Sequence, residues 1–74
     1  MRSFTDPHGR RWDAVLGKES YGTLVIIFTP RGGGEGEVRK AILAAQDQLA
    51  GARELDALGE EELRQRLAGS APWG

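Results

Sequence analysis

His8, the only histidine of the chain, is the first residue to consider for catalysis or metal binding. A general base or a metal ligand needs partners, and the nearest acidic residues in the sequence are Asp6 and Asp13. Residues 6–9, however, form a strong turn sequence with proline and glycine, which places His8 in solvent. No serine lies in a G-x-S-x-G elbow, and no second histidine is present to complete a triad. The sequence therefore predicts no catalytic residue and no metal site, and we expect a protein that is not an enzyme.

Two further stretches resemble ligand sites. Residues 30–36 are rich in glycine, but they lack both the Gly-Lys-Ser/Thr ending of a phosphate-binding loop and the G-x-G-x-x-G spacing of a dinucleotide site. Glu35 and Glu37 would also repel an anion. The three carboxylates at 60–62 fit the first turn of a helix, where acidic side chains interact favourably with the helix dipole. We therefore expect no cofactor and no small-molecule substrate.

A set of basic residues suggests nucleic-acid binding as the alternative function. The set falls on predicted strands or turns and comprises Arg10, Arg11, Lys18, Arg39 and Lys40. Small sheets bind single-stranded nucleic acids with such surfaces when aromatic side chains such as Trp12 and Tyr21 stack on the bases. However, the formal net charge is −1, whereas a dedicated nucleic-acid binder is usually strongly basic. Trp12 also shares a strand face with apolar residues, which favours a place in the core.

The element that organises the chain is the run of β-branched and aromatic residues at 21–29, which predicts a strand. Every residue from Leu24 to Phe28 is apolar. Because successive side chains of a strand point to opposite faces, both faces of this strand require cover. We expect it at the centre of the sheet.

The remaining elements complete a single domain over residues 1–74. The pattern predicts strands at 3–5, 10–16, 21–29 and 37–44, helices at 47–58 and 60–68, a flexible loop at 30–36 and a frayed tail at 69–74. Residues 37–52 also fit an apolar helical stripe, but a glycine-rich loop closes a hairpin easily, which favours the strand. The expected fold class is α+β, with an antiparallel meander of three to four strands packed by two C-terminal helices.

Two short helices cover only one face of such a sheet, so the second face is the candidate interface. Its residues are Val15, Tyr21, Val25, Ile27 and Ile42. An exposed apolar patch on so small a domain usually marks an interaction site. We therefore expect a non-enzymatic protein-interaction module, as a homodimer or as a small accessory or regulatory subunit. The alternative is that the loop and the tail fold over this face and complete a monomer.

Length and composition restrict the environment of the protein. The 74 residues include no cysteine, so neither disulfides nor thiolate metal sites support the small core. The longest apolar run is far shorter than the roughly 20 residues of a membrane span. We expect a cytoplasmic protein without a membrane partner.

Three stretches of the chain resemble small bacterial proteins of unassigned function. They are Phe4-x-Asp6-x-x-Gly9-Arg10-x-Trp12 in the first hairpin, Gly22-Thr23-Leu24-Val25 in the central strand, and Leu58-x-x-Glu61-Glu62-Leu63 in the closing helix. The resemblance spans Phe4 to about Ala68. It implies a bacterial origin and a strand at 37–44, and it assigns no functional residue.

Overall fold

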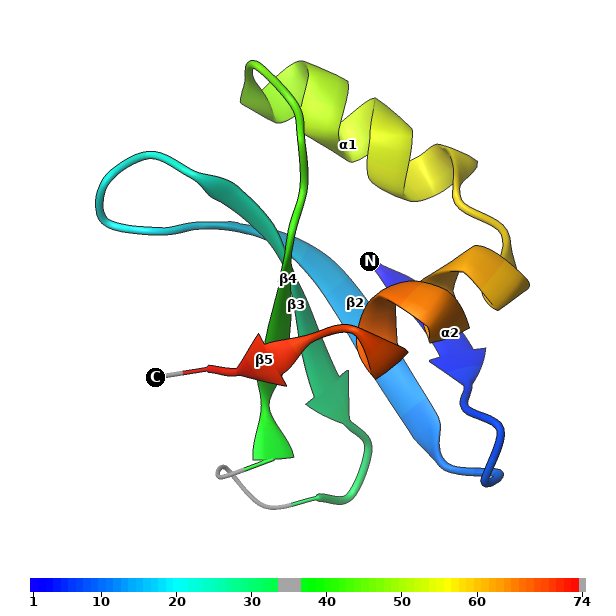
Figure 1. Ribbon diagram of the computed structural model, residues 1–74. Helices are drawn as coiled ribbons and strands as arrows, with labels where there is room; N and C mark the ends of the chain where they lie inside the picture. The colour runs from blue at the N-terminus through cyan, green and yellow to red at the C-terminus, as the bar shows by residue number, and fades with distance from the viewer. Residues whose placement is uncertain (34–36, 74) are drawn as a thin grey trace.

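Five antiparallel strands and two helices make up the described part of the chain (Figure 1). The computed structural model describes residues 1–33 and 37–73. The strands are β1 (Arg2–Thr5), β2 (Arg11–Lys18), β3 (Leu24–Pro30), β4 (Arg39–Ile42) and β5 (Ala71–Pro72), and the helices are α1 (Gln48–Ala57) and α2 (Glu60–Ala68). The α+β class is confirmed. The expected loop at 30–36 begins one residue later than predicted, since Pro30 ends β3, and its residues 34–36 lie outside the described residues, as does Gly74 of the expected tail.

The strands follow one another in the order β1-β2-β3-β4-β5, as in a meander, but the expected number of three to four is wrong. The fifth strand comes from the predicted tail, which returns after α2 and pairs with β4. Arg39 holds it, because its Nε donates to Ser70 Oγ at 2.7 Å and its Nη2 donates to the Ser70 carbonyl at 2.6 Å. The backbone N–H of Trp73 adds a bond of 2.9 Å to the Val38 carbonyl. The tail is therefore part of the sheet instead of frayed.

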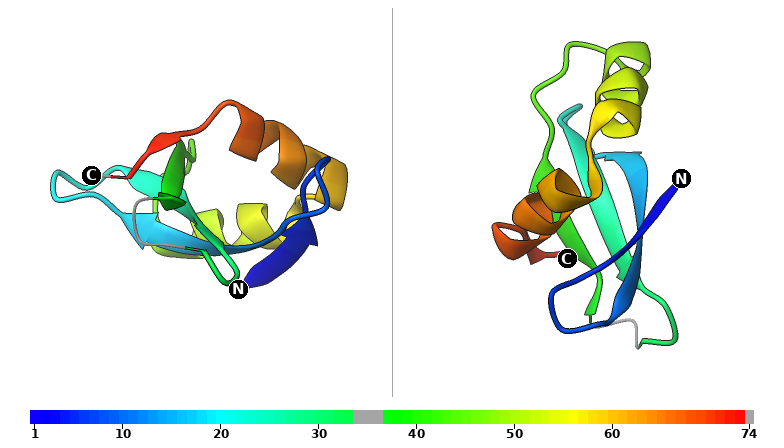
Figure 2. Two further views of the ribbon diagram at one scale, coloured as in Figure 1. Left: turned by 90° about the horizontal axis from the view of Figure 1, so that it is seen from below. Right: turned by 90° about the vertical axis from the view of Figure 1, so that its right-hand side faces the viewer.

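The sheet curls, and both helices lie against its inner face (Figure 2). α1 packs on β2 and β3, whereas α2 contacts β1 and β4. The core between them consists of Phe4, Trp12, Ala14, Leu24, Ile26, Phe28, Leu43, Leu55, Leu58 and Leu63. Since side chains alternate along a strand, the even-numbered residues 12–16 of β2 and 24–28 of β3 face this core and the odd-numbered residues form the outer face.

α1 begins at a side-chain cap and approaches the sheet through a glycine. Asp47 Oδ1 accepts a bond of 2.8 Å from the Ala50 N–H, which is the bond that an N-cap aspartate makes. Gly51 is buried, and a Cβ there would lie 3.1 Å from Leu24 Cδ1. The helix therefore turns its glycine face to the sheet. Leu49, which the apolar spacing places inward, is 62% exposed instead, because it lies on the opposite side of the helix from Gly51.

Two arginines connect the helices to β1. The Nη1 of Arg2 donates to three carbonyls at the end of α1, those of Leu55 at 2.9 Å, Asp56 at 3.1 Å and Leu58 at 2.8 Å, where a helix leaves its last acceptors free. Arg64 of α2 donates its Nε to the Thr5 carbonyl at 2.7 Å. These bonds fix β1 beneath both helices. No helix in the described ranges combines the length and the apolar character that crossing a bilayer requires.

Candidate functional site

Asp6, the first partner considered for His8, holds the turn between β1 and β2. Its Oδ1 accepts from the backbone N–H groups of His8 and Arg10, both at 2.9 Å, and its Oδ2 accepts from Trp12 Nε1 at 2.9 Å. The bond from Trp12, followed by that from the Arg10 backbone, lowers the pKa of Asp6 below its ordinary value. His8 itself is exposed. The carboxylate of Asp6 thus organises a turn and caps the core tryptophan.

Asp13, the second partner considered, belongs to a different cluster on the outer face. Its Oδ1 accepts from Ser3 Oγ at 2.7 Å and from Arg31 Nε at 3.0 Å. The Ser3 hydroxyl and then the Arg31 guanidinium lower the pKa of Asp13. In residues 1–33 and 37–73, no group of three or more histidine or acidic side chains is placed to hold a metal ion.

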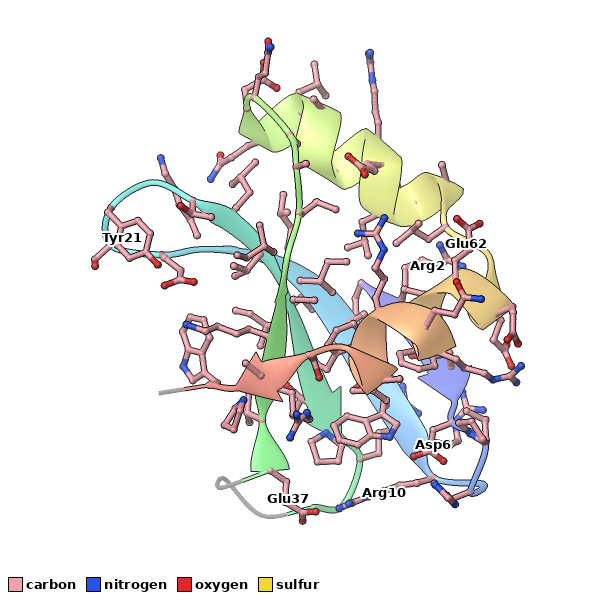
Figure 3. The ribbon with its side chains drawn as sticks, viewed as in Figure 1. Arg2, Asp6, Arg10, Tyr21, Glu37 and Glu62 are labelled. Carbon is pink, nitrogen blue, oxygen red and sulfur yellow. The ribbon has the colours of Figure 1, made fainter. Side chains whose placement is uncertain are left out.

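The structure brings together only Lys18 and Lys40 of the predicted basic patch, which line one shallow depression. The five residues concerned are Arg10, Arg11, Lys18, Arg39 and Lys40. Arg10 faces Glu37 at the end of the sheet, with Nη1 and Oε2 2.5 Å apart (Figure 3). Arg39 projects from the inner face of β4 to bind Ser70, whereas Lys40 projects from the outer face, because neighbouring residues of a strand alternate. The patch therefore divides between two faces, and Arg10, Arg39 and Lys40 are engaged by other groups.

The four aliphatic members of the predicted interface do share the outer face. The strand register places Val15 opposite Ile27 and Val25 opposite Ile42. Their exposure differs sharply, since Ile42 is 70% exposed and Val25 is fully buried. Val25 is therefore not available to a partner, and its place in the predicted patch is wrong.

Glycine 17 explains part of the cover over Val25. Gly17 lies opposite Val25 in the register, and a Cβ at Gly17 would lie only 2.3 Å from Ile27 Cδ1. The Ile27 side chain thus occupies the space above the glycine, beside Val25. A larger residue at position 17 would exclude it.

An ion pair on the outer face supplies further cover. Glu19 Oε1 lies 3.2 Å from Lys40 Nζ, and the Glu19 side chain is only 13% exposed. Gly17, Val25 and Ile42 lie side by side across β2, β3 and β4. Glu19 comes two residues after Gly17 and Lys40 two residues before Ile42, so the ion pair crosses over Val25 on the outer face. The chain itself therefore covers the outer side of β3 at this point.

Two aromatic side chains border this ion pair. The Tyr21 hydroxyl donates to Glu19 Oε2 at 2.7 Å, and the Lys40 Nζ lies 5.4 Å from the centre of the Trp73 ring. The Tyr21 bond and then Lys40 lower the pKa of Glu19, and the same bond raises the pKa of Tyr21. Figure 3 shows Tyr21 at the turn between β2 and β3. Tyr21, Glu19, Lys40 and Trp73 thus contact one another in that order across the outer face.

Most of the exposed large hydrophobic side chains gather at this end of the molecule. In the described ranges they are Met1, Tyr21, Ile42, Leu49 and Trp73, which are 79%, 75%, 70%, 62% and 43% exposed. All except Met1 line one of three shallow depressions, of about 330, 420 and 470 Å³, and each depression borders the turn between β2 and β3. We call the surface formed by Tyr21, Ile42, Leu49, Trp73 and the Glu19–Lys40 pair the hairpin-tip surface.

The first two depressions flank the ion pair and differ in character. Lys18, Ser20 and Lys40 line the first, together with Glu19 and Trp73, so it offers mainly hydrogen-bond donors beside an aromatic ring. Tyr21, Ile42 and Ala71 contribute to the second, which is the more apolar side.

Sequence reasoning misses Glu19 and two of the four hydrophobic members of the hairpin-tip surface. Trp73 lies in the predicted tail, and the only signal for it was the presence of an indole in a segment expected to be solvated. Leu49 fits the apolar stripe of a helix, so nothing in the local pattern assigned it to the surface. Tyr21 and Ile42 are named by the pattern and are exposed.

Comparison of the chain with protein-family models, with curated proteins and with solved structures finds no match. Function is therefore inferred from the geometry of the hairpin-tip surface.

Proposed function

We propose that the protein is a non-enzymatic interaction module that binds another protein through the hairpin-tip surface. The observation that carries the proposal is the gathering of four of the five exposed large hydrophobic side chains of the described ranges in depressions that border the turn between β2 and β3. Three of them, Tyr21, Ile42 and Trp73, line the two depressions that flank the Glu19–Lys40 ion pair. Exposed apolar side chains that gather on one part of a small domain usually mark an interaction site. Tyrosine and tryptophan are also the residue types that contribute most to binding energy at protein interfaces.

The surface is organised before a partner arrives. Tyr21 is held by its bond to Glu19, and Trp73 lies against the Lys40 ammonium. Side chains that are already ordered lose less conformational freedom on binding, so more of the contact energy contributes to affinity. This preorganisation supports a binding role for both aromatic residues.

The charge of the first depression, which Lys18 also lines, favours a partner other than a second copy. Lys18 and Lys40 give +2 and Glu19 gives −1 around the first depression, which leaves +1. In a two-fold homodimer the same patch faces its own copy, so these charges would repel one another. The proposed form is therefore an accessory subunit of another protein. A measurement of the mass in solution tests the alternative, which is a homodimer.

Site-specific photo-crosslinking tests the proposal. A photoreactive phenylalanine derivative replaces Ile42 in one variant and Thr29, an exposed residue at the other end of β3, in the control. In the native cells, we expect one defined adduct from position 42 and none from position 29. The adduct is identified by mass spectrometry and the complex rebuilt from purified components.

Two outcomes would overturn the proposal. The same adducts from both positions would mean non-specific encounter, and no adduct at position 42 would mean that the surface stays free. Light scattering at about 100 μM chain separates the two proposed forms. A monomeric mass supports the accessory subunit. A dimeric mass that the Ile42→Lys substitution reduces to that of a monomer would show instead that the surface forms a homodimer.

A further inference from the structure

β4 has an open edge directly beside the hairpin-tip surface. β5 pairs only with Arg39 and Lys40 of β4. The Leu43 N–H donates to the Leu24 carbonyl at 2.9 Å, so Leu43 faces β3 and Ile42, the residue before it, faces the opposite side. There the backbone N–H and carbonyl of Ile42 point past the end of β5, on the side where Gly69 leaves α2 and lines the same depression as Ile42. No strand in the described ranges stands opposite them.

The two outermost strands are less accessible to a further strand. Pro72 of β5 has no N–H to offer, and proline is a common device for blocking an edge. The edge of β1 is bridged to α2 by the bond from Arg64 Nε to the Thr5 carbonyl. Ile42 therefore offers a donor and an acceptor together at a position that neither device protects.

The depressions beside Ile42 match the side chains that an added strand would carry. When an extended peptide joins a sheet edge, its backbone supplies hydrogen bonds and its alternate side chains enter pockets on one face. The second depression, about 420 Å³ and lined by Tyr21, Ile42 and Ala71, accommodates an apolar side chain. The first offers Lys18, which has no ion pair in the described ranges, with Ser20 and Lys40 as donors for a carboxylate.

We infer that the partner presents an acidic extended segment, which pairs with the backbone of Ile42, places an apolar side chain beside Tyr21 and directs a carboxylate to Lys18 and Lys40. This inference rests on the proposed function and specifies how the same surface is used. Charge complementarity selects an acidic segment, because the first depression carries a net +1.

A library of random eight-residue peptides displayed on phage, selected on the full chain, tests the inference. The counter-selection uses the Ile42→Lys variant, whose fold we expect to be intact because Ile42 is 70% exposed. The enriched peptides should contain an acidic residue and a large apolar residue in an otherwise strand-forming sequence. No enrichment over the counter-selection, or enrichment of basic peptides, would overturn the inference.

Backbone methylation separates edge pairing from simple surface docking. The best enriched peptide is synthesised with and without N-methyl groups on alternate residues, which removes backbone donors and keeps every side chain. Loss of the edge hydrogen bonds should weaken binding about tenfold or more. Ile42→Pro removes the outward N–H together with the isoleucine side chain, whereas Ile42→Ala removes the side chain and keeps the N–H. Ile42→Pro should therefore weaken binding more than Ile42→Ala.

These results distinguish the inference from the proposed function. If the methylated peptide binds as well as its parent and Ile42→Pro binds as well as Ile42→Ala, edge pairing is wrong, but the crosslink at position 42 can still stand. If the crosslink fails as well, the surface has no binding role.

Discussion

Val25 and Ile42 are cross-strand neighbours of similar chemistry and opposite exposure, which makes them a direct test of the outer face. Val25 is fully buried and Ile42 is 70% exposed. Truncating each to alanine changes strand propensity by a comparable amount, so the difference between the two variants reports burial. If the outer face of β3 were open to solvent, both truncations would cost the same.

The expected magnitudes follow from the buried groups. Val25→Ala removes two buried methyl groups at about 0.8 kcal/mol each and leaves a small cavity, so we expect a loss of about 2 kcal/mol. Ile42→Ala should cost less than about 1 kcal/mol, because most of its surface already contacts water. A domain of this size has a total stability on the order of 4–11 kcal/mol, so the difference is large enough to measure.

Urea unfolding followed by circular dichroism, at a chain concentration of about 5 μM to suppress association, measures both variants. With an m-value of about 1 kcal/mol/M, the midpoint of Val25→Ala should lie about 2 M below that of the wild type, and the midpoint of Ile42→Ala within about 1 M of it. Equal midpoints for the two variants, or a larger loss for Ile42→Ala, would refute the assignment of Val25 to the interior.

Three further predictions concern the scaffold. Arg2→Met removes three bonds of 2.8–3.1 Å to the end of α1 and should lower the free energy of unfolding, measured by urea denaturation, by about 2 kcal/mol. The control Arg53→Met, at an exposed position of α1, should change it by less than about 0.5 kcal/mol, and equal effects would contradict the role of Arg2. Gly17→Val should destabilise the protein by about 1 kcal/mol despite the higher strand propensity of valine, because a Cβ there would lie 2.3 Å from Ile27 Cδ1. A variant that is more stable than the wild type in thermal unfolding would refute this packing. The pKa of Asp6 is lowered in the folded state, mainly by the Trp12 bond, so the unfolded chain takes up the proton first and stability falls as the pH drops below about 4. The stability of Asp6→Asn should decline less steeply between about pH 5 and pH 2. An unchanged slope in acid unfolding curves would argue against this contribution.

Local sequence signals account for the elements that depend on neighbouring residues. The apolar run in β3 predicts a strand that is covered on both faces, and Leu24, Val25 and Ile26 are buried. The helix starts near residues 47 and 60 are predicted from residue types alone, because the bonds that begin a helix, Ala50 N–H to Asp47 and Gly59 N–H to Glu62, involve residues within one helical turn. These features require no knowledge of the tertiary structure.

Long-range contacts account for what the sequence does not reveal. β5 contains two residues, one of them proline, so its propensity as a strand is negligible, and it forms through the contact between Arg39 and Ser70. The cover over Val25 likewise depends on an ion pair between residues of β4 and the β2–β3 turn, which are 21 positions apart in the sequence. Residue spacing carries no information on either contact.

The most direct test of the hairpin-tip surface is the affinity of the crosslinked partner, measured by isothermal titration calorimetry with the wild type, Ile42→Lys and Thr29→Lys. Both positions are exposed and lie on β4 and β3, so both variants should remain folded. We predict that Ile42→Lys weakens binding at least tenfold and that Thr29→Lys binds like the wild type. Equal affinity for all three proteins would contradict the assignment of this surface as the binding site.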